Sequence, residues 1–205
     1  MNTSPPTAVV FDLGKVLLDF DYRVAAGRLA PLIDGDVTDV QRLINQAPLL
    51  AEYEAGRIDS REFYRRVQKA LSFRGSYDQF AAAFADIFSA VPDTIALHAE
   101  VRRRGVPTYL LSNTNDLAVG HIRQRYPFFN EFDGHVLSYE CGSLKPEARI
   151  YEVLETVSGR RGPELIFLDD RAENVEAARG RGWRAVLHHD AAQSRAALVT
   201  AGVLA

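Results

Sequence analysis

Five polar residues, each at or just after the end of an apolar run, have side chains suited to binding phosphate or a metal ion. A carboxylate can attack phosphorus or bind a divalent cation, a hydroxyl can donate to phosphoryl oxygens, and an ammonium group can offset their charge. Chance alone rarely produces this order of a nucleophile, a hydroxyl, a lysine and an acidic pair. In chain order the residues are Asp12, Ser112, Lys145, Asp169 and Asp170.

The apolar runs are typical of buried strands in a parallel sheet. Residues 8–11 are Ala-Val-Val-Phe, and a short apolar run without alternation suits a central strand that is covered on both faces. Residues 106–111, 135–139 and 165–168 have the same character. In an open α/β sheet, ligands bind just beyond the carboxyl ends of the strands. We therefore expect Asp12 to lie where the chemistry takes place.

The order of elements predicts an α/β fold with a helical insertion. From Pro92 onward helices and strands alternate, which indicates a parallel sheet flanked by helices. Between residues 17 and 92 there is no convincing strand, and the apolar residues recur at helical spacing. We expect these helices to form a cap over the active end of the sheet. They are expected over residues 22–32, 37–46, 61–71 and 77–88.

The composition is that of an ordinary globular chain. The 205 residues are 47% hydrophobic and 25% charged, and the formal net charge of −3 gives no reason to expect nucleic acid or an anionic membrane as a partner. The single cysteine, Cys141, excludes an intramolecular disulfide and favours a reducing compartment. Because the first residues lack the pattern of a signal peptide and no apolar run reaches membrane-spanning length, we expect a cytoplasmic protein.

The residues at the strand ends belong to four short motifs. They are Phe-Asp-Leu-Gly at 11–14, Leu-Ser-Asn-Thr-Asn at 111–115, Leu-Lys-Pro-Glu at 144–147 and Phe-Leu-Asp-Asp at 167–170. Their order and wording resemble the haloacid dehalogenase (HAD) superfamily of hydrolases, over nearly the whole chain. The stretch from Lys145 to Tyr151 is similar to the bacterial α-D-glucose-1-phosphate phosphatase branch.

The resemblance implies both a domain organisation and a set of metal ligands. Residues 1–16 and 93–205 would form a HAD-like Rossmannoid core, and residues 17–92 would be the inserted cap. Asp12 would be the nucleophile that forms an aspartyl-phosphate. Mg²⁺ would be held by Asp12, the carbonyl of Gly14 and Asp170, with Asp169 acting through a bound water, although the order of this acidic pair stays open. An acidic pair can also simply cap the helix that follows.

Three further groups are expected to bind the phosphate. Lys145 would contact both the phosphoryl oxygens and Asp12, while Ser112 would donate its hydroxyl and Asn113 its backbone N–H. The alternative for Ser112 is a turn residue at a strand end, which is common. For Lys145 it is a solvated loop lysine, which the scarcity of lysine in this chain disfavours.

Gly14 departs from the pattern of the superfamily. Most of its phosphatases have a second aspartate there, which protonates the leaving oxygen and then activates water; such acid–base catalysis contributes about 10²–10⁴-fold, or roughly 3–5 kcal/mol. The leaving group could need little protonation, as in an anomeric sugar phosphate, another group could replace the aspartate, or turnover could be weak. Candidate substitutes are a cap residue, Asp19, Asp21 or Lys15, although the last three are more often solvated.

The sequence predicts a Mg²⁺-dependent phosphatase that acts on a small phosphorylated metabolite, with a sugar 1-phosphate as the expected substrate. Carbon–halogen hydrolysis stays open because it needs no leaving-group acid, but it has no need of the acidic pair. A phospholigand-binding or protein-binding module without turnover is the third possibility. We expect a monomer or homodimer with neither nucleic acid nor membrane as a partner. Candidate substrate contacts in the cap are Tyr22, Arg23, Glu52 and Tyr53.

Overall fold

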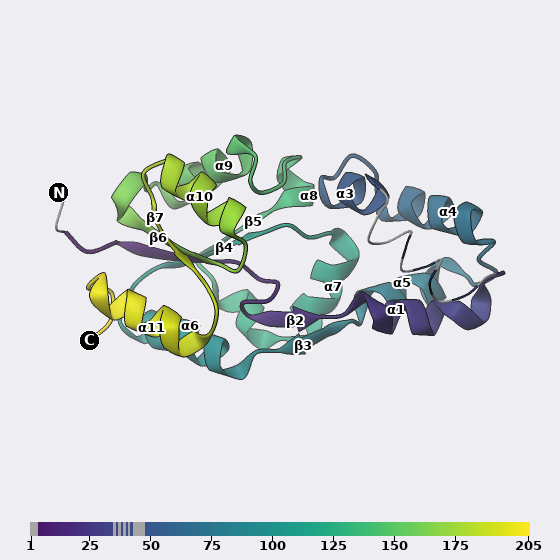
Figure 1. Ribbon diagram of the computed structural model, residues 1–205, viewed down its shortest axis with the longest axis horizontal. Helices are drawn as coiled ribbons and strands as arrows, with labels where there is room; N and C mark the ends of the chain where they lie inside the picture. Colours follow the sequence, from purple (N-terminus) through teal and green to yellow (C-terminus); the bar gives the residue numbers. More distant parts are fainter. Residues whose placement is uncertain (1–3, 35, 37, 39, 41, 43–47) are drawn as a thin grey trace.

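A five-stranded parallel sheet forms the centre of the molecule (Figure 1). The computed structural model describes residues 4–34, 36, 38, 40, 42 and 48–205. The strands lie in the order β5, β4, β1, β6, β7, so that β1 is the middle strand and pairs in parallel with β4 and β6. The predicted parallel sheet is confirmed. The strands span Ala8–Phe11 (β1), Thr108–Ser112 (β4), Gly134–Leu137 (β5), Leu165–Asp169 (β6) and Arg184–Leu187 (β7).

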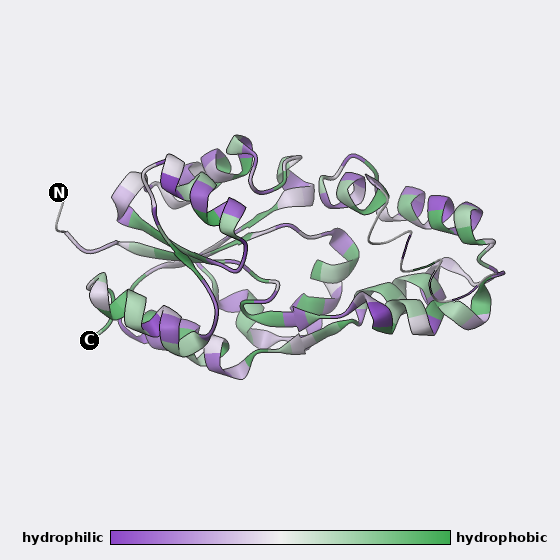
Figure 2. Ribbon diagram, in the orientation of Figure 1, coloured by the Kyte–Doolittle hydropathy of each residue, from purple (hydrophilic) through white to green (hydrophobic). Residues whose placement is uncertain are grey.

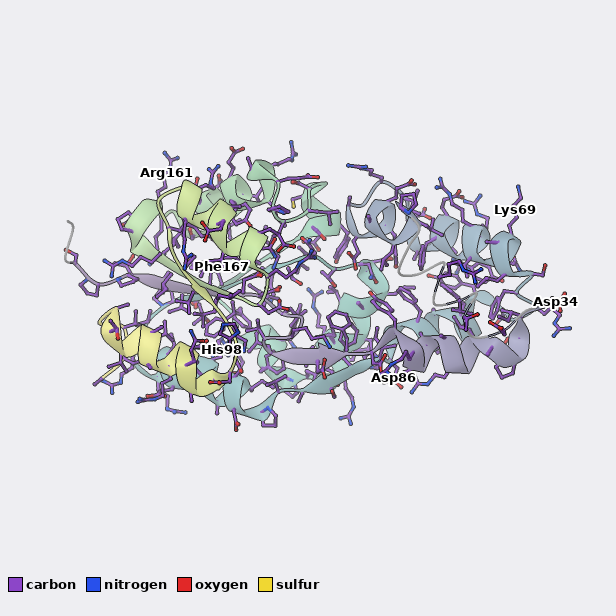
Figure 3. All side chains as sticks on the ribbon, in the orientation of Figure 1. Asp34, Lys69, Asp86, His98, Arg161 and Phe167 are labelled. Atoms are coloured by element: carbon purple, nitrogen blue, oxygen red, sulfur yellow. The ribbon has the colours of Figure 1, made fainter. Side chains whose placement is uncertain are left out.

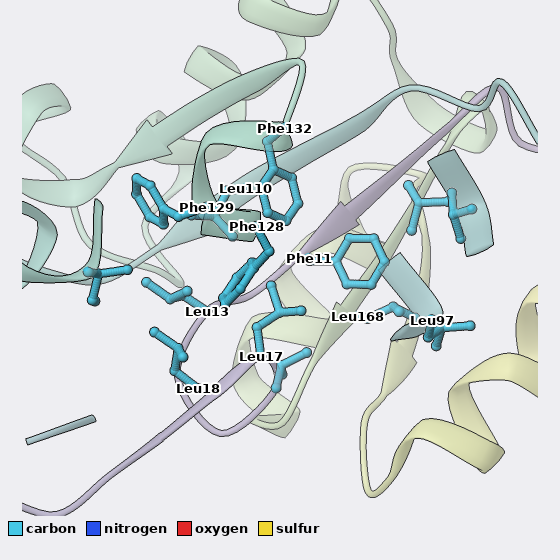
Figure 4. Close-up of a cluster of buried hydrophobic side chains, with 14 of the residues drawn as sticks. Phe11, Leu13, Leu17, Leu18, Leu97, Leu110, Phe128, Phe129, Phe132 and Leu168 are labelled. Carbon is cyan, nitrogen blue, oxygen red and sulfur yellow. The ribbon is translucent and has the colours of Figure 1, made fainter. Parts of the chain in front are cut away.

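Both faces of the sheet are covered, because successive side chains of a strand point to opposite faces. Val9 and Phe11 of β1 belong to one apolar cluster, part of which Figure 4 shows, whereas Ala8 and Val10 belong to another. Each of these four residues is fully buried. Burial on both faces explains why the sequence of β1 is apolar without alternation.

Helices pack on the two faces in separate layers. Helices α6 (Pro92–Arg103), α7 (Asp116–Arg125) and α11 (Ala191–Thr200) contribute to the cluster around Phe11. Helices α9 (Ala148–Ser158) and α10 (Ala172–Gly180) cover the opposite face (Figure 1). In Figure 2 the helices carry both hydrophilic and hydrophobic residues, as elements with one buried side do. None of the described helices is long and apolar enough to cross a membrane.

The segment between β1 and α6 is helical and has an apolar cluster of its own. Helix α4 buries Phe63, Val67 and Leu71, at the spacing of one helix face, against residues of α1, α3 and α5. The division into a core and a cap at residues 16 and 93 stays a prediction. The helices span Tyr22–Leu29 (α1), Pro48–Glu54 (α3), Ser60–Leu71 (α4) and Tyr77–Ala85 (α5), with a 3-10 turn at Ala30–Leu32.

The expectation that residues 17–92 contain no strand was wrong. β2 (Leu18–Phe20) and β3 (Phe88–Ala90) pair antiparallel and connect the helical segment to the sheet (Figure 1). Each has only three residues, too few to show an alternating pattern, and the pairing joins positions far apart in the chain. Helix α3 was also not expected. The helix predicted over 37–46 lies mostly outside the described residues.

Candidate active site

The residues singled out in the sequence converge at the carboxyl ends of the three central strands. Asp12 directly follows β1, Ser112 ends β4 and Asp169 ends β6. These strands are parallel neighbours, so their carboxyl ends share one edge of the sheet. Lys145 reaches that edge from the segment between α9 and the short helix α8 (Ser138–Cys141).

A buried lysine joins two of the carboxylates. Lys145 Nζ lies 2.7 Å from Asp12 Oδ1 and 2.7 Å from Asp169 Oδ2, and its side chain is 1% exposed. The ammonium group also lies 5.4 Å from the ring centroid of Phe167, which Figure 3 labels in the sheet. A buried cation without such partners would be strongly destabilising. Lys145 is therefore a buried, paired residue of the site and not a solvated loop residue.

Burial and charge act in opposite directions on this group of residues. Burial raises the pKa of Asp12 to about 7; the charge of Asp169 adds to this rise, and the ammonium group of Lys145 opposes it. Burial lowers the pKa of Lys145, but the two carboxylates outweigh that effect, so the pKa lies above its usual value. Lys145 is therefore charged at neutral pH and favours the ionised form of Asp12, which is the form that a nucleophile requires.

One oxygen of Asp12 is held and the other is left for chemistry. The backbone N–H of Leu13 donates to Asp12 Oδ1 at 2.7 Å, and Lys145 bonds the same oxygen. None of the described residues donates a hydrogen bond to Asp12 Oδ2. Asp12 also lines an open cleft, so Oδ2 is the oxygen placed to contact a ligand.

The side chain of Asn113 clamps the backbone of Lys145. Asn113 Oδ1 accepts from the Lys145 N–H at 2.7 Å, and Asn113 Nδ2 donates to the Lys145 carbonyl at 3.0 Å. The sequence suggested only a role for the Asn113 backbone. The side chain has a second role, because it ties the lysine loop to the end of β4.

Replacing Asn113 by alanine is expected to cost about 1–3 kcal/mol in the free energy of unfolding, since it removes both partners of a half-buried backbone pair. Asn130→Ala is the matched control: the Asn130 amide donates to a backbone carbonyl at 3.3 Å on the surface, and its loss should cost less than about 0.5 kcal/mol. Urea unfolding measures both. Equal losses would contradict the clamp.

The two adjacent aspartates have different surroundings. Asp169 is fully buried, and both its oxygens are occupied by Lys145, the Arg171 N–H and the Asn174 amide at 2.7–3.1 Å. Asp170 is half-buried and lines the cleft. Burial and the charge of Asp169 raise the pKa of Asp170, although Lys145 and Arg171 lower it. Asp170 is thus the freer of the two carboxylates.

The site has the donor set of a divalent cation site. Carboxylate oxygens of Asp12, Asp169 and Asp170 all lie within 4.8 Å of one another, while Lys145 is the one ammonium group that contacts them in the described part of the chain. Asn174 Oδ1 is buried beside them, with no donor among the described residues. Surplus negative charge on hard oxygen ligands is what Mg²⁺ requires, so the residues fit that ion.

Ser112 and Gly14 line the same region. Ser112 is 2% exposed, and its hydroxyl makes one long hydrogen bond of 3.4 Å, to the Asn113 carbonyl, which leaves it available to a better acceptor. A Cβ added at Gly14 would lie 2.8 Å from the ring of Phe20. The space that a side chain at position 14 would need is therefore taken by Phe20.

A cleft of about 250 Å³ opens over the carboxylates. One wall is the strand edge, with Asp12, Lys145 and Asp170, and the other comes from residues between β1 and α6. Of the four candidate contacts in the predicted cap, only Tyr22 lines the cleft within the described chain. Five further lining residues were not predicted from the sequence: Phe20, Leu50, Glu54, Arg171 and Asn174.

The other three candidates have partners elsewhere. Arg23 pairs with Asp21, Glu52 pairs with Arg66 at 2.8 Å, and Tyr53 is buried with its hydroxyl on Asp116. No sequence pattern pointed to Glu54, because it ends a helix of seven residues, which is too short to show a reliable periodicity.

Comparisons with known proteins find a hydrolase family and several phosphatases that are similar to this chain. A family model described as haloacid dehalogenase-like hydrolase matches residues 6–182. The chain is 28% identical to a sesquiterpene phosphatase of Aspergillus oryzae, with 85% of this chain and 86% of that protein covered. It is 24% identical to D-ribitol-5-phosphate phosphatase of Bacteroides thetaiotaomicron, with 85% and 88% covered. A HAD family enzyme of the same bacterium, solved in complex with magnesium and inorganic phosphate, has a TM-score of 0.79 at 24% identity, with 90% and 94% covered.

Proposed function

Because this chain belongs to the haloacid dehalogenase-like hydrolases, we propose that it is a Mg²⁺-dependent phosphatase that hydrolyses a small phosphorylated metabolite through an aspartyl-phosphate on Asp12. The observation that carries the proposal is the buried ammonium group of Lys145 between Asp12 and Asp169, beside the freer carboxylate of Asp170. The two relatives named above are phosphatases by description, which supports the same reaction.

The chain's own residues account for the first displacement. Oδ2 of Asp12 attacks phosphorus while Oδ1 is held by Lys145 and Leu13, which orients the carboxylate. Lys145 keeps its proton and offsets the charge of the phosphoryl oxygens. Ser112 donates its hydroxyl and Asn113 its backbone N–H to those oxygens. Asp169 and Asn113 act on Lys145 and hold it in place.

Mg²⁺ would be held by Asp12, Asp170 and the carbonyl of Gly14. When bound, the ion reduces the repulsion between the carboxylate and the phosphate dianion. Asp169 is already satisfied by protein donors, which favours an indirect role for it through water.

The size of the cleft favours a small substrate. Pockets for drug-sized ligands measure about 300–1,000 Å³, and the cleft here measures about 250 Å³. A sugar or polyol phosphate fits that size better than a sesquiterpenyl phosphate does. The expected sugar 1-phosphate stays a proposal, and the ribitol 5-phosphate of the second relative is a candidate of similar size.

Chelation of the metal is expected to abolish phosphate release. With Mg²⁺ present, purified protein should release phosphate from at least one of α-D-glucose 1-phosphate, D-ribitol 5-phosphate and p-nitrophenyl phosphate. EDTA should reduce the rate to background, and excess Mg²⁺ should restore it, because three clustered carboxylates then regain their counter-ion. A malachite green assay measures the released phosphate.

Each competing function predicts a different set of results when chloride release and phosphate binding are measured beside phosphate release. A dehalogenase would release chloride from 2-chloropropionate in the presence of EDTA and would not release phosphate. A binding module would bind inorganic phosphate in the presence of Mg²⁺ but hydrolyse nothing. Phosphate release that survives EDTA would contradict the proposed metal dependence.

A further inference from the structure

The position that usually supplies the acid is closed in this chain. Gly14 has no side chain, and the ring of Phe20 occupies the space in which one would lie. Asp19 and Asp21 do not replace it: hydrogen bonds from Lys15 and Arg23, respectively, hold the pKa of each carboxyl below its usual value. A leaving oxygen that needs a proton therefore takes it from another group in the cleft.

Glu54 is the one carboxyl group that the described helical segment places in this cleft. It ends α3 and lines both the main cleft, with Asp12 and Gly14, and an adjoining hollow that contains Ser112. Asp12 directly follows β1, whereas Glu54 reaches the same cleft from the end of α3 in the helical segment. In phosphoryl transfer the attacking and leaving oxygens lie roughly in line, so the leaving oxygen lies on the side of phosphorus away from Asp12 and needs a donor from another element of the cleft.

Three contacts fix the end of α3 on the core. The Ser138 hydroxyl donates to the backbone carbonyl of Glu54 at 2.6 Å. The preceding residue, Tyr53, is hydrogen-bonded to Asp116. Gly56 has a φ of 66° and packs so closely on α8 that an added Cβ would lie 2.2 Å from the carbonyl oxygen of Tyr139. Glu54 is therefore held at a fixed place beside the catalytic edge of the sheet.

We propose that Glu54 is the general acid and base of the reaction, in place of the aspartate that is absent at position 14. This inference rests on the proposed phosphatase function and deepens it. Glu54 then makes an anomeric leaving group unnecessary, so that ordinary alkyl phosphates are also substrates.

The proton follows a balanced path in two steps. In the first, Asp12 forms a bond to phosphorus, the bond from phosphorus to the leaving oxygen breaks, and the Glu54 carboxyl gives its proton to that oxygen. In the second, the Glu54 carboxylate takes a proton from water while the water oxygen attacks phosphorus. Phosphate leaves, Asp12 is regenerated and Glu54 is protonated again.

The surroundings of Glu54 suit a group that exchanges a proton near neutrality. Burial is the largest effect on the pKa of Glu54 and raises it to about 7, although the charge of Arg171 and a hydrogen bond from Tyr22 partly oppose the rise. An acid catalyst works best with a pKa near the working pH. The other charged groups that line the cleft are Lys15, Asp12, Lys145, Asp170 and Arg171.

Glu54→Gln tests the proposal with esters of different leaving groups. The amide keeps the size and hydrogen bonding of the side chain but has no proton to give. The rate for ethyl phosphate, whose leaving oxygen is strongly basic, should fall about 10²–10⁴-fold. The rate for p-nitrophenyl phosphate, whose leaving oxygen is weakly basic, should fall far less. The descending limb of the kcat/KM profile, on which the rate falls as Glu54 loses its proton above about pH 7, should be absent from the variant. In Tyr22→Phe that limb should shift to higher pH, because the change removes a hydrogen bond that lowers the pKa of Glu54.

Glu52→Gln is the control, because Glu52 lies on the same helix but pairs with Arg66 away from the cleft, and it should leave both rates unchanged. If Glu54→Gln lowers both esters equally, or neither, Glu54 is not the acid although the phosphatase function stands. Hydrolysis of p-nitrophenyl phosphate alone by the wild type also overturns the acid role. If the wild type hydrolyses neither ester in the presence of Mg²⁺, the proposed phosphatase function fails first.

Discussion

Replacing Asp12 by asparagine is expected to reduce phosphate release by about 10⁴-fold or more, to the background of the assay. The amide oxygen is a poor nucleophile, and the substitution removes one of the carboxylates proposed to hold Mg²⁺. The fold should survive, because Lys145 keeps its 2.7 Å contact with Asp169. Phosphate release under saturating Mg²⁺, together with the thermal unfolding midpoint, measures both effects.

Asp190→Asn provides a matched control for this change. Asp190 caps α11 through a hydrogen bond to the N–H of Gln193, and asparagine caps helices about equally well. The control should therefore keep both activity and stability. An Asp12→Asn enzyme that retains a tenth or so of the wild-type rate would be incompatible with a nucleophilic role.

Lys145→Met is expected to destabilise the fold by about 3–5 kcal/mol, because it leaves buried carboxylates without their counter-charge. Asp12 and Asp169 are both buried and both lie 2.7 Å from the ammonium group. Activity should be lost as well, since Lys145 is proposed to offset the charge of the phosphoryl group. Urea unfolding of the metal-free protein measures the free energy of unfolding.

The loss of stability in Lys145→Met should depend on pH, and it should be larger at higher pH. Without Lys145, the pKa of Asp12 in the folded state rises further above its usual value, so the folded state binds a proton that the unfolded state releases. Stability therefore increases as the pH falls through that raised pKa, and the deficit of Lys145→Met should be larger at pH 8 than at pH 5.

Lys69→Met is the control for this variant. Lys69 is an exposed residue in the last turn of α4 and lies at the end of the molecule remote from the sheet (Figure 3). The change should cost less than about 0.5 kcal/mol at either pH. A deficit of Lys145→Met that stays constant across this range would show that lost packing, and not unpaired charge, is the cause.

Features that depend on a few neighbouring residues could be predicted from the sequence. The strand at Ala8–Phe11 and the position of Asp12 follow from one apolar run and the rule that sites lie at the carboxyl ends of parallel strands. The same rule brings Ser112 and Asp169 to one edge. Localisation and oligomeric state stay predictions, because no local pattern determines them.

Features that depend on distant partners were missed. β2 and β3 are three-residue strands that pair across the whole helical segment, so neither has a sequence pattern that would reveal it alone. The clamp between Asn113 and Lys145 joins residues 32 positions apart. Glu54 acquires its raised pKa from burial in a cleft built by several elements, which no local pattern at residue 54 records.

The most direct test of the central claim is to trap the covalent intermediate. The enzyme would be mixed with substrate and Mg²⁺, quenched in acid within the first turnover and analysed by peptide mass spectrometry. We expect one added phosphoryl group, carried by Asp12 and absent from Asp12→Asn. A phosphoryl group carried by any other residue, or phosphate formed in a burst with no phosphorylated protein at any quench time, would contradict nucleophilic catalysis by Asp12.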